Sequence, residues 1–310
     1  KTKYTTKVFD TIPKKLLDEI NNNSVKETYK NKNIIYDIKK SKIVDENLIN
    51  VLGNSKDTYK IKKIFEEYEV DFVIYTLTSF WIVDSNESYD ELVSENLSPI
   101  ISILNIMKEY DVNKFIYMSS GGSIYGESNE PIRESSENQP ISFYGWIKEA
   151  AETYIKYMSR VNKDLKYIIF RPSNVYGKYQ ELNRIIGVAL KNTYIGERMN
   201  IFGSIDTKKD YIHIDDFSEI VLSLIENDKW NEIYNIGSGV GTSTKEILEY
   251  AQKIVNKKLD INYSESKTGD IAYSVLNVDK VKKILGKDNF MSVYDGMEKM
   301  FDYVKKELDK

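Results

Sequence analysis

The sequence predicts an α/β fold in which strands of a parallel sheet alternate with helices. Three short apolar runs, at residues 71–77, 115–118 and 168–171, have the composition of strands buried on both faces of a sheet. Segments with a single apolar face, at residues 59–68 and 96–107, separate them as amphipathic helices would. An alternation of this kind is typical of a parallel sheet covered by helices.

The beginning of the chain fits this pattern least well. The stretch KTKYT at residues 1–5 is too polar for a central strand of a parallel sheet. A helix is predicted over residues 16–20, because Thr11 can cap it and Pro13 suits a first helical position. The chain begins with Lys1 rather than Met, which suggests a trimmed start, and we see no signal peptide in it.

The second half of the chain continues the alternation. A strand at residues 168–171 is followed by a predicted turn at residues 172–177, and Asp215 and Asp216 are predicted to cap a helix. Residues 234–239 return the chain to the main sheet. Three amphipathic helices are predicted after this strand, at residues 243–254, 278–285 and 292–308.

Composition excludes several classes of function. The 310 residues are 41% hydrophobic, which is enough to build two lobes with buried cores. A net charge of −4 gives no basic field for nucleic acid, and zero cysteines exclude disulfides and cysteine–zinc sites. The lone His213 cannot build a histidine-based metal site, so we expect no metal. No apolar run is long enough to cross a membrane, and we expect a cytoplasmic protein.

The region from Phe115 to Lys148 carries the candidate chemistry. A buried strand breaks into the run SSGG, and a helix follows that holds Tyr144 and Lys148 four residues apart, on one face. A phenol must lose roughly three pKa units, about 4 kcal/mol, to act as a base near neutrality, and an ammonium about 4 Å away supplies that much. Tyr144 is therefore the candidate acid/base. A chance match among 24 tyrosines is the alternative.

Five segments of the chain match, in order and spacing, the motifs of one enzyme family. They are SSGGSIYG (119–126), YGWIK (144–148), RPSNVYG (171–177), KDYIHIDD (209–216) and YNIGSG (234–239). On these residues the chain resembles the extended short-chain dehydrogenase/reductase family, in its nucleotide-sugar epimerase/dehydratase branch. The resemblance covers about residues 34–290, and five ordered matches are more specific than any single one.

This resemblance implies a Rossmann-type doubly wound parallel sheet with a smaller, discontinuous C-terminal substrate-binding lobe. We assign residues 1–171 and 212–239 to the dinucleotide-binding domain, and residues 172–211 and 240–310 to the lobe. Members of this family commonly pair through the helix at residues 96–107 and the helix of the catalytic tyrosine. A homodimer is therefore implied.

The family's cofactor loop departs from its usual form here. The resemblance places Thr6 on the threonine of a Thr-Gly-x-x-Gly-x-x-Gly loop, and the glycine positions then hold Lys7, Asp10 and Pro13. Three side chains at these positions obstruct the close approach of a pyrophosphate, and Asp10 adds charge repulsion. The loop is missing from or altered in this sequence, it has diverged while binding persists, or the cofactor has been lost. We favour the first two explanations.

Other positions still support a dinucleotide, which the resemblance identifies as NAD. Asp37 ends a predicted strand at residues 33–36, where a carboxylate can bind the adenosine ribose and repel a 2′-phosphate. Lys39 and Lys40 follow and weaken the choice of NAD over NADP, and a purely structural aspartate is the alternative. The remaining cofactor-binding residues implied by the family are Asn54, Thr76, Leu77, Thr78, Asn96, Tyr144 and Lys148.

The hydroxyl donor also departs from the commonest pattern. Its usual position, four residues before the tyrosine of a Tyr-Gly pair, holds Gly121. Ser120 and Ser123 are the available hydroxyls, and a subgroup with Ser-Ser-Gly-Gly-Thr at this site favours Ser123. Family dehydratases carry an acidic pair after their threonine. Gly122 and Ser123 cannot replace such a pair, so dehydration is disfavoured.

The resemblance implies a nucleoside-diphosphate sugar as substrate. Lys209 and Lys267 stand where the family has arginines that grip a diphosphate, so the charge remains but the bidentate geometry is lost. An ordinary surface lysine is the alternative at each position. The other substrate-binding residues implied are Ser79, Ser123, Asn174, Arg184 and Asp270.

These residues lead to an NAD-dependent nucleotide-sugar 4-epimerase as the predicted function. Tyr144 would take the proton of the C4 hydroxyl while hydride passes to the nicotinamide, and the 4-keto sugar would turn over before both return. A 4-ketoreductase would use the same Tyr144 and Lys148 but consume reduced cofactor. A cofactor-free binding or partner protein of the same fold is the third reading.

Overall fold

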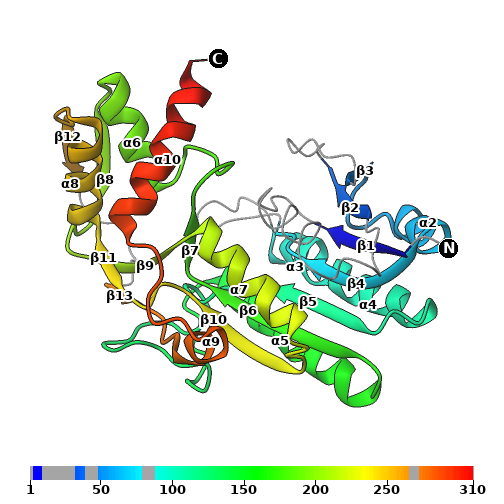
Figure 1. The fold of residues 1–310 in the computed structure, drawn as a ribbon. Helices are drawn as coiled ribbons and strands as arrows, with labels where there is room; N and C mark the ends of the chain where they lie inside the picture. The colour runs from blue at the N-terminus through cyan, green and yellow to red at the C-terminus, as the bar shows by residue number, and fades with distance from the viewer. Residues whose placement is uncertain (1–2, 9–31, 39–47, 79–87, 265–271, 310) are drawn as a thin grey trace. The chain divides into compact units, whose positions relative to one another are not determined.

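The computed structural model describes residues 3–8, 32–38, 48–78, 88–264 and 272–309 (Figure 1). The chain divides into two compact units, which are described separately. The first unit comprises Lys1–Ile124, Pro140–Arg171 and Leu224–Tyr234; the second comprises Tyr125–Gln139, Pro172–Ser223 and Asn235–Lys310. Our sequence-based division into domains stays a prediction.

The first unit is built on a seven-stranded sheet in the order β10-β6-β5-β4-β1-β2-β3. Its strands are β1 (Lys3–Val8), β2 (Lys32–Asp37), β3 (Leu48–Leu52), β4 (Glu69–Tyr75), β5 (Lys114–Met118), β6 (Lys166–Pro172) and β10 (Glu232–Ile236). Every pairing from β3 across to β6 is parallel. The chain moves outward from β1 to β3, crosses to β4, and then moves outward in the opposite direction. This doubly wound parallel sheet confirms the predicted fold class.

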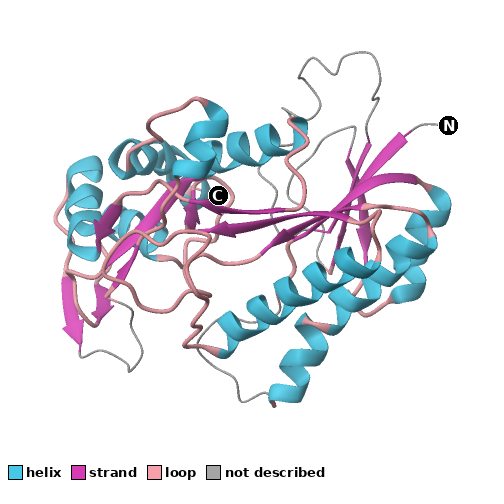
Figure 2. Cartoon of the chain, turned by 90° about the horizontal axis from the view of Figure 1, so that it is seen from below, coloured by secondary structure: helices cyan, strands magenta, loops and turns pink. Residues whose placement is uncertain are grey.

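Helices pack along this sheet and complete its core (Figure 2). They are α2 (Thr58–Glu67), α3 (Tyr89–Asn96), α4 (Ser98–Glu109) and α5 (Phe143–Val161). Side-chain caps define several of their starts, since Asp57 accepts a hydrogen bond from Lys60 and Ser88 forms a capping box with Glu91. Apolar side chains from the helices and strands form one buried cluster. Among its members are Ile34, Val73, Leu104, Met107, Phe115, Ala151 and Ile155.

One N-terminal expectation was wrong. Lys3–Val8 forms a central strand, hydrogen-bonded on both sides, with Thr6 opposite Ile34 of β2 and Val73 of β4. Backbone pairing on both sides therefore outweighs the polar composition of the segment, as sheet context often overrides strand propensity. Thr6 itself lies within this strand. The helix predicted at residues 16–20, with its flanking residues, lies outside the described residues.

The helix predicted over residues 96–107 is α4 (Ser98–Glu109), but it does not begin at Asn96. Asn96 ends α3, where its amide Nδ2 donates to the Leu92 carbonyl at 2.8 Å. The next helix, α4, starts at Ser98, and Pro99 occupies its first turn, where a missing N–H costs nothing. A continuous helix would bring the Pro99 ring against the carbonyl of the residue four positions earlier, so the helix is interrupted before Pro99.

The second unit contains short sheets and a layer of helices. Its strands are β7 (Asn174–Tyr176), β8 (Met199–Phe202), β9 (Lys208–His213), β11 (Gly241–Ser243), β12 (Ile261–Ser264) and β13 (Tyr273–Ser274). Its helices are α6 (Ile185–Ile195), α7 (Ile214–Glu226, which continues into the first unit), α8 (Thr244–Val255), α9 (Asp279–Leu285) and α10 (Val293–Leu308). α6, α8 and α10 pack on one another around a second core.

The three C-terminal helices confirm the periodicity of the sequence. Ser243 caps α8 through a capping box with Glu246, and Ser292 caps α10. Residues 172–177, predicted as a turn, instead contain β7, which pairs in parallel with β9. Within the described ranges, no helix combines the length and the apolar composition that crossing a bilayer requires.

The N-cap prediction for Asp215 and Asp216 was also wrong. Strand β9 ends at His213 and α7 begins at Ile214, so both aspartates already lie inside the first turn of the helix. The direct passage from strand to helix leaves no capping position for either carboxylate. Negative charge in a first turn still interacts favourably with the helix dipole.

Candidate active site

Helix α5 holds Tyr144 and Lys148 on its buried face. The hydroxyl of Ser142 starts the helix by accepting a hydrogen bond from the Gly145 amide at 3.1 Å. Apolar residues one and two turns further, including Ala151, pack into the core of the first unit. The same face therefore directs Tyr144 and Lys148 inward, and they are only 7% and 4% exposed.

The ammonium of Lys148 lies between two aromatic rings. Its Nζ is 5.6 Å from the ring centroid of Tyr144 and 5.1 Å from that of Tyr117. It donates a hydrogen bond to the Met118 carbonyl at 3.0 Å, at the end of β5. Burial lowers the pKa of Lys148 to about 8, and the nearby carboxylate of Glu152 opposes that shift. The predicted pairing of a tyrosine with a lysine is therefore present in the geometry.

Hydroxyl groups gather where β5 ends. Ser120 Oγ donates to Ser123 Oγ at 3.2 Å, and Ser123 is only 7% exposed. Ser119 is buried, and its Oγ has no hydrogen-bond partner in the part of the chain that the structure describes. A Cβ at Gly145 would lie 2.2 Å from the Ser123 carbonyl oxygen, so only glycine lets the first turn of α5 approach this loop. The neighbour of Gly145 in that turn is Tyr144.

The sheet edge next to these groups fits a dinucleotide. The strand order reverses between β1 and β4, and ligands of doubly wound sheets bind at the carboxyl ends of strands at such a point. Asp37 ends β2, and the half-buried Thr76, Leu77 and Thr78 follow β4 at the same edge. The buried Oγ of Ser119 at the end of β5, which has no hydrogen-bond partner among the described residues, is a further polar group there and suits a polar ligand.

Two other predicted cofactor residues make internal contacts. Asn54 Oδ1 accepts a hydrogen bond from the Lys56 amide at 2.9 Å, and its carbonyl oxygen accepts one from the Tyr36 hydroxyl at 2.8 Å. These bonds fix the loop after β3. Asn96 is buried in the last turn of α3. Ser79, Lys267 and Asp270, predicted to bind substrate, lie outside the described residues.

The remaining predicted substrate residues belong to the second unit. Asn174 begins β7 and donates through Nδ2 to the Asp210 carbonyl at 2.9 Å. Lys209 is half-buried on β9, opposite Thr242 of β11. Arg184 is the exposed residue that precedes α6. β9 thus holds the predicted lysine next to the backbone group that Asn174 binds.

Asp210 explains why two of the motifs occur together. Its buried carboxylate accepts hydrogen bonds from Ser238 N and Oγ, both at 2.8 Å, from Gly239 N at 3.1 Å and from Leu276 N at 3.3 Å. A Cβ at Gly237 would lie 2.4 Å from this carboxylate. The aspartate of KDYIHIDD therefore fixes the glycines of YNIGSG. Burial raises the pKa of Asp210, although these hydrogen bonds oppose the shift.

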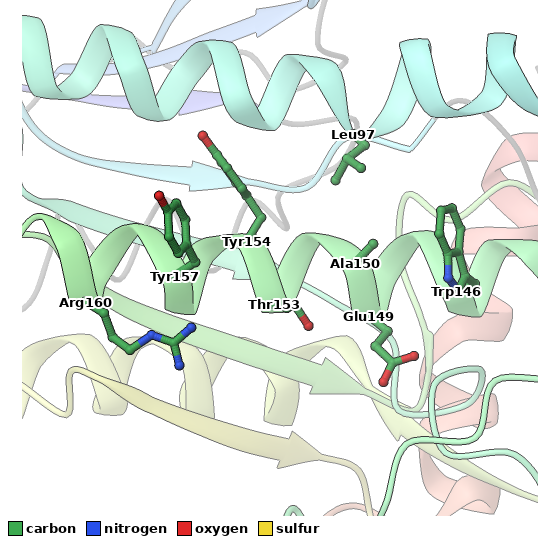
Figure 3. Close-up of a pocket in the computed structure, with 8 residues that line it drawn as sticks. All are labelled: Leu97, Trp146, Glu149, Ala150, Thr153, Tyr154, Tyr157 and Arg160. Atoms are coloured by element: carbon green, nitrogen blue, oxygen red, sulfur yellow. The ribbon is translucent and has the colours of Figure 1, made fainter.

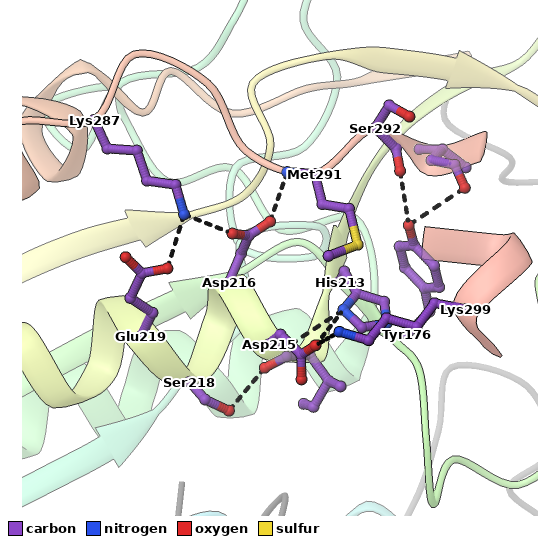
Figure 4. A network of polar contacts seen from close by, with 12 residues as sticks. Tyr176, His213, Asp215, Asp216, Ser218, Glu219, Lys287, Met291, Ser292 and Lys299 are labelled. Carbon is purple, nitrogen blue, oxygen red and sulfur yellow. Dashed lines mark hydrogen bonds and ion pairs between the residues drawn. The ribbon is translucent and has the colours of Figure 1, made fainter. Parts of the chain in front are cut away.

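The single histidine has a structural environment (Figure 4). His213 is 3% exposed and meets Tyr176 edge-on, with ring centroids 5.4 Å apart. Its Nδ1 accepts a hydrogen bond from the Asp215 amide at 3.3 Å, and the Asp215 carboxylate also pairs with Lys299. No group of His, Asp or Glu side chains among the described residues is arranged to hold a metal ion.

A second network in Figure 4 ties α7 to the segment before α10. Lys287 donates to Asp216 at 2.8 Å and to Glu219 at 2.7 Å. The other oxygen of Asp216 accepts a hydrogen bond from the Met291 amide at 2.7 Å. Asp216 is thus a buried tether, whereas Glu219 stays exposed to solvent.

Sequence reasoning missed one buried ion pair near the candidate site. Glu152 lies one turn after Lys148 on α5 and is bound by Arg171 of β6 through two hydrogen bonds, of 2.9 and 2.6 Å. Both side chains are almost completely buried. The spacing of Tyr144, Lys148 and Glu152 at four-residue steps was a signal that could have identified the glutamate.

The chain is similar to known proteins along most of its length. A dTDP-4-dehydro-6-deoxyglucose reductase of Escherichia coli is 26% identical over 82% of this chain and 81% of its own length. A putative UDP-glucose 4-epimerase of Methanocaldococcus jannaschii is 29% identical over 76% of this chain and 78% of its own. The two relatives bear the names of different reactions.

Solved structures have the same fold. A UDP-glucose 4-epimerase of Thermotoga maritima, solved with UDP-glucose, superposes with a TM-score of 0.87, at 25% identity, over 99% of this chain and all (100%) of the other. A UDP-glucose 4-epimerase of Thermus thermophilus, solved with NAD, superposes with a TM-score of 0.85 at 20% identity, over 98% of this chain and 99% of the other. The second likeness shows the fold alone.

The sequence also matches a family model. That model describes the NAD dependent epimerase/dehydratase family and matches residues 21–237. The matched region covers well over half of the chain and includes β2 to β6 with the helix of Tyr144 and Lys148. It confirms the resemblance inferred from the five motifs. The protein is a member of the NAD dependent epimerase/dehydratase family.

Proposed function

We propose that the protein is an NAD-dependent 4-epimerase of a nucleoside-diphosphate sugar. The observation that carries this proposal is the buried contact on α5, where the ammonium of Lys148 lies 5.6 Å from the ring centroid of Tyr144. An adjacent cation favours the phenolate form of tyrosine, which is the form that can accept a proton near neutral pH.

Each polar group around this pair has a role in the proposal. Tyr144 accepts the proton of the sugar C4 hydroxyl and donates it back after the 4-keto sugar has turned over. Lys148 stabilises the phenolate, and Ser123 donates a hydrogen bond to the sugar oxygen, oriented by its own bond with Ser120. NAD, when bound, supplies the hydride acceptor and donor.

The binding roles follow the same proposal. Asp37 accepts hydrogen bonds from the adenosine ribose, and the groups after β4 contact the rest of the cofactor. Lys209 and Arg184 contribute positive charge for the diphosphate of the substrate, because cations pair with phosphate oxygens. The other proposed ligand-binding residues are Thr6, Asn54, Thr76, Leu77, Thr78, Asn96, Asn174, Ser79, Lys267 and Asp270.

A 4-ketoreductase of a nucleotide sugar is the second candidate. The observation that favours it is the Escherichia coli relative, which is named as a reductase of a 4-dehydro sugar nucleotide and aligns over 82% of this chain. Such an enzyme would use the same tyrosine to protonate the sugar oxygen. It would consume reduced cofactor in each turnover, whereas an epimerase regenerates its cofactor in place.

The test is an assay for bound cofactor followed by turnover. The purified protein is denatured, the released dinucleotide is identified, and fresh protein is then mixed with UDP-glucose without added cofactor. Recovery of NAD, together with a 4-epimer that the wild type forms and Tyr144→Phe does not, would support the epimerase. Oxidation of added NAD(P)H with a 4-keto sugar would select the reductase. Tight substrate binding with no cofactor and no turnover would instead indicate a binding protein.

We also propose a homodimer that forms along α5. Figure 3 shows a pocket beside this helix, with Trp146 towards its N-terminal end and Arg160 towards its C-terminal end. Leu97 and residues of α5 line it, and Trp146 and Tyr157 are 44% and 49% exposed. Exposed aromatic side chains of this size are typical of protein interfaces.

The charges in this pocket favour a second copy as the occupant. Glu149 and Arg160 are eleven residues apart on α5, about 16 Å along the helix axis. In an antiparallel pair with the two-fold axis beside Tyr154, Glu149 faces Arg160 of the partner subunit, and the contact is repeated by symmetry. Opposite charges thus meet at both ends of the aromatic patch.

Charge reversal tests this pairing. Glu149→Arg should place like charges together and shift the protein to monomers in analytical ultracentrifugation. The double variant Glu149→Arg/Arg160→Glu should restore the dimer, because it exchanges the two charges. A monomeric wild type, a Glu149→Arg variant that stays dimeric, or a double variant that stays dissociated would contradict the proposal.

A further inference from the structure

Glu152, one turn beyond Lys148 on α5, forms an ion pair with Arg171 of β6. The Glu152 carboxylate is 0% exposed and the Arg171 guanidinium is 2% exposed. Arg171 binds both carboxylate oxygens, and Lys156, one turn further along α5, has its Nζ 3.7 Å from one of them. Charge-assisted hydrogen bonds to a guanidinium are among the strongest that a carboxylate makes, so Arg171 fixes Glu152 in place.

Lys148, by contrast, has no carboxylate bound to it in the described contacts. Its hydrogen-bond acceptor is the Met118 carbonyl, and its other close neighbours are the rings of Tyr117 and Tyr144. The negative charge that opposes its desolvation is that of Glu152, one turn along the same face. A buried ammonium in such a place needs a nearby anion to keep its proton.

The other titratable groups around Lys148 are neutral or cationic. Burial raises the pKa of Tyr117 on β5 well above its usual range, and Tyr75 on β4, which packs against Tyr117, is affected in the same way. Lys156 and Arg171 are cations, so they cannot favour the protonated form of Lys148. Glu152 is therefore the group with the right charge.

We infer that Glu152 is a positioning residue that keeps Lys148 protonated beside Tyr144, and that Arg171 fixes the Glu152 carboxylate for this purpose. The inference rests on the roles proposed above for Tyr144 and Lys148. It explains why α5 carries charged side chains at four-residue steps into a core where apolar residues would pack at least as well. Glu152 itself touches neither the substrate nor the cofactor in this scheme.

Removal of the Glu152 carboxylate should raise the titration midpoint of Tyr144. With Glu152 present the pKa of Lys148 is about 8, so removal of the anion leaves a largely neutral amine near neutral pH. Tyr144 then loses the adjacent cation that favours its phenolate. Glu152 also repels the Tyr144 phenolate, but it lies two turns away whereas Lys148 lies one, so the effect through Lys148 is the larger.

The test is a pH titration of tyrosinate absorbance on the full-length protein without added ligands. The curve of a matched Tyr144→Phe variant is subtracted in each background, so that the difference reports Tyr144 alone among the 24 tyrosines. Glu152→Gln should raise the midpoint of Tyr144 by about one pH unit or more. In the conservative Glu152→Asp variant the Tyr144 midpoint should stay within a few tenths of a pH unit of the wild-type value. This is roughly a third, at most, of the rise expected for Glu152→Gln.

A double-variant cycle separates this role from simple anchoring of α5. In a Lys148→Met background, Glu152→Gln should produce no further rise of the Tyr144 midpoint, because the ammonium through which it acts is gone. An equal rise in both backgrounds, or no rise in either, would overturn the inference. If Glu152→Gln fails to fold, the neutral pair Glu152→Met/Arg171→Met takes its place. The Tyr144 midpoint should then rise by a smaller amount, because this variant removes the Arg171 cation together with the Glu152 anion.

The titration involves no substrate and no turnover. A protein with no activity on any nucleotide sugar would overturn the proposed function while the coupling of Glu152, Lys148 and Tyr144 could still be measured. An active epimerase with an unchanged Tyr144 midpoint in Glu152→Gln would overturn the inference alone.

Discussion

Buried charges are handled differently in the two units. In the first unit, Lys148 is 4% exposed and meets one carbonyl oxygen and two aromatic rings, and its pKa falls to about 8. In the second unit, the equally buried Asp210 accepts four hydrogen bonds, from Ser238, Gly239 and Leu276. In the described contacts the ammonium of Lys148 is thus incompletely satisfied by hydrogen bonds, whereas the carboxylate of Asp210 is saturated with them.

The contrast separates chemistry from architecture. An incompletely satisfied group changes its charge easily near neutral pH and can influence a neighbour, which is what an acid/base site needs. A saturated carboxylate has no lone pairs left for a ligand and instead connects segments that are distant in sequence. Removal of Lys148 should therefore affect activity, and removal of Asp210 should affect stability.

The largest expected effect is on the proposed base itself. Tyr144→Phe removes only a hydroxyl and should lower turnover by roughly 10²- to 10⁴-fold, which is the usual contribution of general acid/base catalysis. The thermal midpoint should change little, because the ring keeps its place on the buried face of α5. The measurement is the initial rate of 4-epimer formation together with a melting curve. Retained activity would remove Tyr144 from the mechanism.

Lys148→Met should gain stability while it loses activity. The pKa of Lys148 falls from 10.5 to about 8 on folding, so the folded state binds fewer protons than the unfolded state between these values. Stability therefore rises with pH across this window, and the full penalty applies below its lower end. A neutral side chain of similar size avoids the penalty and should stabilise the protein by about 2 kcal/mol at about pH 7.

Denaturant unfolding at several pH values checks that expectation. The difference between Lys148→Met and wild type should shrink as the pH rises from about 8 through 10.5, because above this window the wild-type lysine is neutral in both states. Lys156→Met, at a partly exposed lysine on the same helix, is the matched control. A destabilised Lys148→Met at every pH would mean that the lysine is a structural residue, contrary to the contrast drawn above.

Local patterns in the sequence were enough to predict one of the two contrasted sites, the one that holds Lys148. Tyr144 and Lys148 lie on one helix, so their four-residue spacing alone predicts a shared face. The strands at residues 71–77 and 115–118 were found because parallel strands buried on both faces are continuously apolar. The polar strand β1 was missed for the same reason, since its place is set by backbone pairing with β2 and β4.

Contacts between distant residues account for what could not be predicted. Glu152 and Arg171 are 19 residues apart and belong to a helix and a strand. Asp210 lies 28 residues from Ser238 and 66 from Leu276. Neither partnership follows from a helical or strand period, because each depends on how the elements pack. The motifs around Asp210 could be recognised, but the reason for their joint presence needed the structure.

Asp210→Asn should destabilise the second unit by roughly 1–3 kcal/mol. The asparagine amide has nearly the same shape as the carboxylate. Its NH2 group, however, would face backbone N–H groups that donate hydrogen bonds to the carboxylate in the wild type. Hydrogen exchange of the Ser238, Gly239 and Leu276 amides should accelerate, because these are the groups left without an acceptor. Unchanged exchange at all three amides would show that the carboxylate is not their structural acceptor.

The smallest expected effects compare two carboxylates that share one lysine. Asp216 is 7% exposed and also accepts the Met291 amide, whereas Glu219 is 48% exposed and binds only Lys287 in the described contacts. Glu219→Gln should therefore cost less than about 0.5 kcal/mol, and the loss should vanish at high salt. Asp216→Asn should cost about 1–2 kcal/mol and resist salt, because a buried acceptor is lost. Denaturant unfolding at low and high ionic strength measures both, and equal losses would show that burial does not distinguish the two carboxylates.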